Sequence, residues 1–353
     1  MQRPLNINVW LWLVLLSVQA HGSPTCATSQ ELTATQLVQS AQASLERNDL
    51  PCAAKQLEQA LALDARHKGA RIGLSHVLIR LQRWPDADIQ VRKLRLDFPE
   101  EAEPRYLAAL VAFGRGEMER VCELSEQALE RGDKRAEIYR LLAVAEYLLE
   151  RRDKFEAHIR LALKLNPLDA EAHYHLGRYY FEDKRYSESL AEFQAALKAE
   201  PLHYKAHYYA GLIYESQNEG DRAKEAFQAA IRIIDLKQQR YSWPFTDLGK
   251  RLLNEGEYER AIGWLYRAVR NDPVSPHAHY HYAKGLFQKE PSPEVKRILQ
   301  TAIRLDPGYS EAYYLLARYY QKIGETQLAK ETFATFEELK KNPLPSPYGL
   351  RRW

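Results

Sequence analysis

The feature of this chain that most constrains its fold is a small residue that returns at a fixed interval. The interval is 34 residues from Ala34 to Lys237, which gives six units; after four extra residues, 238–241, it resumes at Ser242 and gives three more units that end at Lys341. We number this small residue position 8 of each unit. The nine residues at position 8 are Ala41, Ser75, Ala109, Ala143, Gly177, Gly211, Gly249, Ala283 and Ala317. Such a period indicates an array of supersecondary units rather than a single globular core.

Other positions of the unit explain what it folds into. Apolar residues at helical spacing make each half-unit an amphipathic helix. Positions 20 and 27 are also mostly small, as at Ala53 and Ala60, so that two antiparallel helices can approach closely. Proline at position 32 ends the second helix in five units, at Pro99, Pro167, Pro201, Pro273 and Pro307. The pattern predicts an all-α stack of nine helix–turn–helix hairpins, in which each hairpin contacts its neighbours.

The segment His173–Pro201 resembles a tetratricopeptide repeat (TPR). The family's positions are filled here by Leu176, Gly177, Tyr180, Tyr186, Phe193, Ala196 and Pro201. The resemblance covers residues 34–237 and 242–341, which hold all nine repeats, although the first repeat departs from the family pattern at Ser44 and Ala65. It implies an α-solenoid that winds as a right-handed superhelix, with the first helix of each repeat lining a concave groove.

Residues 1–20 differ from the rest of the chain. Arg3 is their only charge, and the apolar run Val9–Val18 is shorter than the ~20 residues that span a bilayer. A small-residue exit ends at Ala20, so the segment is predicted to be a cleaved secretory signal peptide rather than a retained anchor. We expect a periplasmic or secreted protein that starts near His21, with a lead-in over 21–33 and no membrane span after cleavage.

Three cysteines, Cys26, Cys52 and Cys122, would then face an oxidising compartment, and their spacing does not resemble a zinc site. Cys26 precedes the first helix and Cys52 lies at the start of the second. A helix of 14 residues separates the two by ~20 Å, whereas a disulfide needs Cα atoms within about 7 Å. The prediction is that no intramolecular disulfide forms.

Histidines recur in three units. His173, His207 and His279 share position 4, where a half-buried packing role is the simpler interpretation. His277 and His281 lie four residues apart on one helix face, and Glu311 is the one obvious third ligand. A structural zinc site uses four ligands, so we predict no metal and no cofactor.

Function is expected on the concave face, which the resemblance assigns to positions 2, 5, 9 and 12 of the first helices. In the first four units these positions are largely apolar, and from the fifth unit a tyrosine is followed by a cation four residues on. We predict a partner-binding groove on this face. The groove residues are Tyr106, Tyr147, Tyr174, Arg178, Phe181, Tyr208, Trp243, Lys250, Tyr280, His281, Lys284, Phe287, Tyr314 and Arg318.

Aromatic residues interleaved with cations suit a protein or extended peptide, including an acidic one, because tyrosine offers apolar area and arginine binds carboxylates. The alternatives are that these tyrosines only support stacking, or that the aromatic residues bind carbohydrate. Nucleic acid is not expected, because 50 Lys and Arg nearly balance 47 Asp and Glu. We find no catalytic fingerprint and expect a non-enzymatic scaffold or adaptor of an exported, cell-envelope assembly. The proline-rich tail, 342–353, either folds back on Phe333 and Phe336 through Tyr348, Leu350 and Trp353 or docks onto another molecule.

Overall fold

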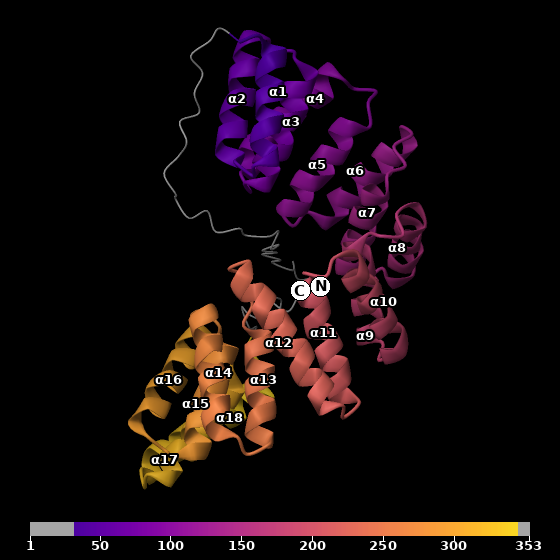
Figure 1. Ribbon diagram of the computed structural model, residues 1–353. Helices are drawn as coiled ribbons and strands as arrows, with labels where there is room; N and C mark the ends of the chain where they lie inside the picture. Colours follow the sequence, from indigo (N-terminus) through magenta and orange to yellow (C-terminus); the bar gives the residue numbers. More distant parts are fainter. Residues whose placement is uncertain (1–31, 345–353) are drawn as a thin grey trace. The chain divides into compact units, whose positions relative to one another are not determined.

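The computed structural model describes residues 32–344, which form α-helices and no strands (Figure 1). The predicted signal peptide, residues 21–31 of the lead-in and residues 345–353 of the tail lie outside the described residues. The helices are α1 Ala34–Glu46, α2 Leu50–Leu63, α3 Lys68–Arg80, α4 Trp84–Asp97, α5 Glu103–Gly114, α6 Met118–Glu130, α7 Ala136–Leu148, α8 Arg152–Leu165, α9 Ala170–Glu182, α10 Tyr186–Ala199, α11 Tyr204–Ser216, α12 Gly220–Leu236, α13 Trp243–Asn254, α14 Tyr258–Asn271, α15 Pro276–Lys289, α16 Pro293–Leu305, α17 Ser310–Lys322 and α18 Thr326–Lys341.

The chain divides within α9 into two compact units, residues 1–179 and 180–353. From here on, these are the first and second unit, and each 34-residue repeat is called a hairpin. In each unit, helices pack against their neighbours in sequence, as α3 does against α2 and α4. The first helices of successive hairpins also touch, for example α3 with α5 and α15 with α17. This is the packing expected of hairpins that stack one on the next, because a lone hairpin cannot bury its apolar face.

The small residues hold the helices together at close range. All nine residues at position 8 are buried, as predicted. A methyl group added at Gly249 would lie 2.6 Å from Cγ of Leu265 on α14, and one added at Gly211 would lie 2.6 Å from the ring of Phe227 on α12. These distances are far below van der Waals contact, so in these two hairpins the helices approach closely only because glycine has no side chain.

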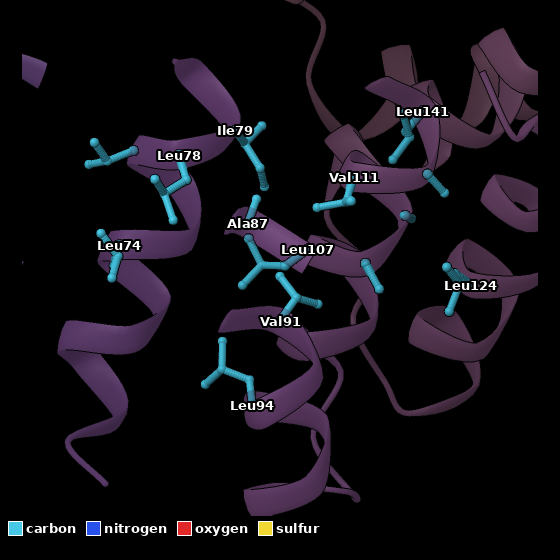
Figure 2. Packing of buried hydrophobic residues seen from close by; sticks show 14 of the residues in the cluster. Leu74, Leu78, Ile79, Ala87, Val91, Leu94, Leu107, Val111, Leu124 and Leu141 are labelled. Atoms are coloured by element: carbon cyan, nitrogen blue, oxygen red, sulfur yellow. The ribbon is translucent and has the colours of Figure 1, made fainter. Parts of the chain in front are cut away.

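Larger apolar side chains fill the space between hairpins. In the first unit, Val91 of α4 lies close to Leu107 of α5 (Figure 2), and Leu94 and Val111 belong to the same cluster. Leu74 belongs to the same cluster and is 2% exposed. Within the first unit, the buried apolar residues therefore form one cluster that extends from α1 to α7.

The turn inside each hairpin requires a left-handed residue, which the sequence analysis did not anticipate. Position 15 has φ between 55° and 84° in eight hairpins, at Asn48, Gln82, Gly116, Glu150, Lys184, Asn218, Gly256 and Gly324. Glycine and asparagine tolerate this conformation best. The turn between α15 and α16 differs, because Glu290 is extended with φ −160°. Proline at 291 explains the difference, since a residue before proline avoids the helical region.

The four inserted residues, 238–241, are packed against the second unit. The side chain of Asn271 accepts a hydrogen bond from the backbone N–H of Tyr241 at 2.8 Å and donates one to the carbonyl of Gln239 at 2.8 Å. The ring of Tyr241 lies against those of Tyr204 and Tyr208. The insertion thus links α12 to α13 along the chain and is held in place by contacts with α11 and α14.

The prediction that no intramolecular disulfide forms is wrong for Cys52, which is disulfide-bonded. Cys122 is free and buried, and Cys26, the remaining cysteine in the sequence, lies outside the described residues. The prediction assumed that Cys26 continues away from the start of α1. About seven residues separate Cys26 from that helix, and an extended chain of that length spans about 23 Å, which is enough to return to α2.

The hairpin of α13 and α14 provides a matched test of the close approach. Replacing Gly249 with Ala should destabilise the protein by about 1 kcal/mol, because the added methyl overpacks against Leu265. Replacing Gly263 on α14 with Ala should instead stabilise it by about 0.5–1 kcal/mol, since no atom lies within 4 Å of the added methyl and alanine favours a helix. Urea unfolding monitored by circular dichroism measures both changes. Equal effects of the two substitutions would contradict the packing described here.

Candidate functional site

In the first unit, the predicted groove residues are largely engaged with other side chains. The guanidinium of Arg135 lies over the half-buried ring of Tyr106 at 4.5 Å and also pairs with Glu103. Burial is the main cause that raises the pKa of the Tyr106 hydroxyl. Tyr147 is half-buried and packs at 5.1 Å from the ring of Phe155.

Tyr174 and Arg178 are buried, with only 2% and 6% of their surface exposed. The guanidinium of Arg178 lies 6.0 Å from the ring of Tyr147 and 5.8 Å from that of Tyr174. The tyrosine–cation pair that the sequence suggested as a binding element is therefore an internal packing contact. It offers little surface to a partner.

In the second unit, Tyr208 and Lys250 are joined by a carboxylate that sequence reasoning did not single out. The Tyr208 hydroxyl donates to Oδ2 of Asp247 at 2.8 Å, and Nζ of Lys250 donates to Oδ1 at 2.8 Å. Burial, followed by the charge of Asp247, raises the pKa of Tyr208 well above its ordinary value. Phe181 packs edge-on against Tyr209 at 5.4 Å. These residues of α11 and α13 stabilise the contact between hairpins.

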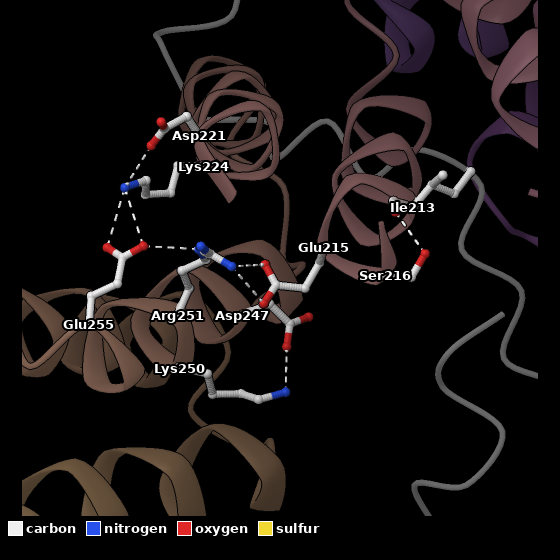
Figure 3. Close-up of polar contacts among 9 residues, drawn as sticks. All are labelled: Ile213, Glu215, Ser216, Asp221, Lys224, Asp247, Lys250, Arg251 and Glu255. Carbon is white, nitrogen blue, oxygen red and sulfur yellow. Dashed lines mark hydrogen bonds and ion pairs between the residues drawn. The ribbon is translucent and has the colours of Figure 1, made fainter. Parts of the chain in front are cut away.

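The neighbouring charges are also neutralised (Figure 3). Nη1 of Arg251 lies 3.2 Å from both oxygens of Glu215, and its Nε lies 3.0 Å from Oε1 of Glu255. Lys224 contacts Glu255 at 3.3 Å and Asp221 at 3.1 Å. Cations on α12 and α13 therefore face carboxylates of the same unit and present little net charge to a ligand.

An aromatic row continues along α13 and α15. The rings of Trp243 and His277 lie 4.2 Å apart, and those of His277 and His281 lie 4.4 Å apart. Tyr280 then contacts His281 at 4.8 Å and Tyr309 at 5.2 Å. The rings cover one another, so few flat faces are left open.

Among the residues of this row, His281 has the pKa that is shifted furthest from its ordinary value. It is 8% exposed, and its Nδ1 has no hydrogen-bond partner among the described residues. Burial, followed by the positive charges of His277, Lys250 and Lys284, lowers its pKa well below the ordinary value. No group of three His, Cys, Asp or Glu side chains within residues 32–344 is arranged to hold a metal ion.

The histidines at position 4 contact the turn that precedes their helix. Nε2 of His173 lies 3.1 Å from the carbonyl of Pro167, and Nε2 of His207 lies 3.1 Å from that of Pro201. In the later hairpin, Nδ1 of His279 lies 2.9 Å from the carbonyl of Ser275. Each imidazole can thus satisfy a carbonyl at the junction between two hairpins.

Cations without carboxylate partners gather on α15 and α17. A cavity of about 400 Å³ is lined by Phe287, Arg318, Gln321 and Lys322. Lys284, one turn before Phe287, is half-buried. We call these five residues the basic groove. Its lysines make no ion pair or hydrogen bond with any described residue, and Arg318 donates only to the hydroxyl of Tyr314, at 3.2 Å.

The sequence pattern predicts Lys284, Phe287 and Arg318 as groove residues but not Gln321 and Lys322. Lys322 follows Arg318 by four residues and therefore shares its helix face, a signal that could have identified it. The site thus combines an apolar wall with three side-chain cations. Such a surface suits a ligand that carries carboxylates beside an apolar side chain.

A second cluster of titratable groups lies in the first unit. Glu146 is 1% exposed, and its Oε2 lies 2.7 Å from Nδ1 of His158. Burial, assisted by Glu146, raises the pKa of the nearby Cys122 thiol to about 11. A thiol that stays protonated at neutral pH is a poor nucleophile, so this cluster does not indicate a catalytic centre.

The burial of His281 predicts that acid destabilises the second unit. Its pKa in the folded state lies below the ordinary value of 6.5, so unfolding takes up a proton and stability falls as the pH drops below about 6.5. The slope is at most about 1.4 kcal/mol per pH unit for this group. Urea unfolding at pH 7.5 and pH 5.5 should therefore show a smaller acid loss in His281→Gln than in the parent. Identical losses would contradict the prediction.

Comparisons with known proteins agree with this architecture. Tetratricopeptide-repeat family models match residues 156–199, 185–236 and 298–331. The TPR repeat-containing protein YpiA of Bacillus subtilis (strain 168) is 32% identical over 93 residues, which are 26% of this chain and 22% of that protein. The chain therefore matches only about a fifth of the length of this curated relative. No helix within residues 32–344 is long and apolar enough to cross a bilayer.

Two solved structures share the fold at low sequence identity. The APC/C hetero-tetramer Cut9–Hcn1 aligns with a TM-score of 0.64 at 14% identity, covering 80% of this chain and 55% of that one. Pseudomonas aeruginosa pilF aligns with a TM-score of 0.54 at 19% identity, covering 62% and 97%. Together with the helix pairs described above, these matches show that the chain is an all-α solenoid built from TPR hairpins.

Proposed function

We propose that this protein is a non-enzymatic scaffold or adaptor that binds an extended, acidic segment of a partner protein in the basic groove. The observation that carries the proposal is the contrast between two sets of cations. Lys250, Arg251 and Lys224 face carboxylates of their own unit. Arg318 and Lys322, by contrast, border a cavity beside Phe287 without an acidic partner.

The chemistry of recognition follows from this contrast. Unpaired cations attract carboxylates, and Arg318 can grip one in two places. The ring of Phe287 provides apolar area for a side chain of the same segment. The tetratricopeptide fold supports this assignment, because its hairpins typically mediate protein–protein contacts.

The carbohydrate alternative has weaker support. Sugars stack on open aromatic faces, but Trp243 already has a ring 4.2 Å away and Tyr280 packs edge-on against Tyr309. Salt separates the two functions, since ion-paired recognition weakens at high ionic strength and stacking changes little.

A paired charge reversal tests the binding function. Fluorescence anisotropy with an extended peptide of alternating Glu and Phe should show about 100-fold weaker binding to Lys284→Glu with Arg318→Glu, because two charge-assisted contacts become repulsive. The control, Arg270→Glu with Lys330→Glu, changes the net charge equally through exposed cations on α14 and α18 and should bind normally. Equal losses in both variants, or preference for the matching Lys/Phe peptide, would refute the proposal.

We further propose that the protein is exported to the periplasm or secreted as part of a cell-envelope assembly. The pattern of residues 1–20 supports export, and so does the disulfide at Cys52, because such bonds persist in oxidising compartments.

Export has a direct chemical signature. When the full chain is produced in a Gram-negative bacterium, the protein in the periplasmic fraction should begin at or near His21, and intact mass spectrometry should show a gain of about two mass units on reduction. A protein that keeps residues 1–20 and stays in the cytoplasm would rule out this localisation.

A further inference from the structure

The last hairpin, α17 and α18, leaves an aromatic surface that is covered in earlier hairpins. Tyr314 lies 5.9 Å from the ring of Phe333 and 5.3 Å from that of Phe336. We call these three residues the terminal aromatic face. No further hairpin follows α18 within the described residues to pack against it.

Equivalent positions show how much surface is left open. Tyr208 occupies the same position in its hairpin as Tyr314, yet 4% of it is exposed, against 41% of Tyr314. Phe227 is fully buried, whereas its counterpart Phe333 is only half-buried.

Position 27 is also more exposed in the last hairpin than in the others, and there it holds a different type of residue. It is buried in the eight preceding hairpins, where it is Leu94 once and alanine in the others. In the last hairpin it is Phe336, which is half-buried. A bulky ring at this position would obstruct the ordinary approach of another helix. The face is therefore shaped for a different occupant.

The residues that leave α18 pack beside the turn that precedes α17. Leu344 packs against Gly308, which lies two residues before α17; a methyl group added to Gly308 would lie 3.1 Å from Cβ of Leu344. The direction is thus toward the base of the same hairpin. Residues 345–353 follow from this point.

These nine residues can reach the terminal aromatic face. Prolines at 345 and 347 favour an extended conformation of about 3.1 Å per residue, so the segment spans about 28 Å. Phe336 lies five residues before the end of α18, or about 7.5 Å along the helix. The segment carries three apolar anchors, Tyr348, Leu350 and Trp353.

We propose that residues Pro345–Trp353 fold back and cap the terminal aromatic face of their own chain. Covalent attachment favours this occupant over a second copy, because a short linker holds the anchors at an effective concentration of about millimolar. Capping would remove three aromatic rings from water at the open end of the stack, where solenoids need their last apolar surface covered.

Hydrogen exchange of the full-length chain tests the cap. Replacing Tyr348, Leu350 and Trp353 with Ser should accelerate exchange of the α18 amides about tenfold and leave α14 unchanged. The control, Arg351→Ser with Arg352→Ser, keeps the three anchors and should exchange like the parent. Acceleration in the control, or none in the triple variant, would overturn the proposal.

Repeating the experiment in a Phe336→Ala variant distinguishes loss of the cap from a general loss of stability. Phe336→Ala places at position 27 the residue that seven other hairpins carry, so the hairpin should still fold. In this background the triple tail variant should have little further effect, since the contact is already lost. A second copy as the occupant would instead appear as a dimer by light scattering, with α18 protection that rises with protein concentration and does not depend on the tail; that result would refute the cap.

Discussion

The close approach of paired helices is the interaction on which the rest of the structure depends. At Gly249 and Gly211 there is no room for even a methyl group, and the buried alanines at positions 20 and 27 extend the same constraint along each hairpin. Because each hairpin buries one face internally and another against its neighbours, stability is distributed along the stack. No central core is needed, and the exposed face of each first helix is left available for recognition.

Whether a cation on a first helix stays open depends on the carboxylates that surround it. Glu215 of α11 neutralises Arg251 across the contact between hairpins, whereas Asp247 neutralises Lys250 within α13 and also binds Tyr208 of α11. Lys284 of α15 and Lys322 of α17 pair with no carboxylate among residues 32–344. Lys250 and Lys284 thus share position 9 of their hairpins, yet only Lys250 has an acidic partner there.

The sequence predicted the fold class well, because the small residues that permit helix packing are themselves the visible signal. The site was predicted only in part. Tyr174 and Arg178 match the groove pattern but are buried, since one turn of helix presents neighbouring positions to both the groove and the adjacent hairpin. The repeat predicts which face of a helix a residue lies on, but it does not predict how deeply side chains of the adjacent hairpin bury that residue. Asp247 was overlooked for the same reason, because its importance comes from Tyr208, a residue 39 positions away.

Where the repetition breaks, the chain gains features that a regular array lacks. Tyr208, Tyr280 and Tyr314 share one position, yet the first is buried and hydrogen-bonded, the second packs edge-on against Tyr309, and the third is open. The irregular turn at Glu290 joins α15 to α16, directly after the helix that carries Lys284 and Phe287. A regular array would repeat one surface nine times. The features that distinguish one hairpin from the next therefore lie in departures from the repeat, such as the insertion 238–241, the turn at Glu290 and Phe336 at position 27.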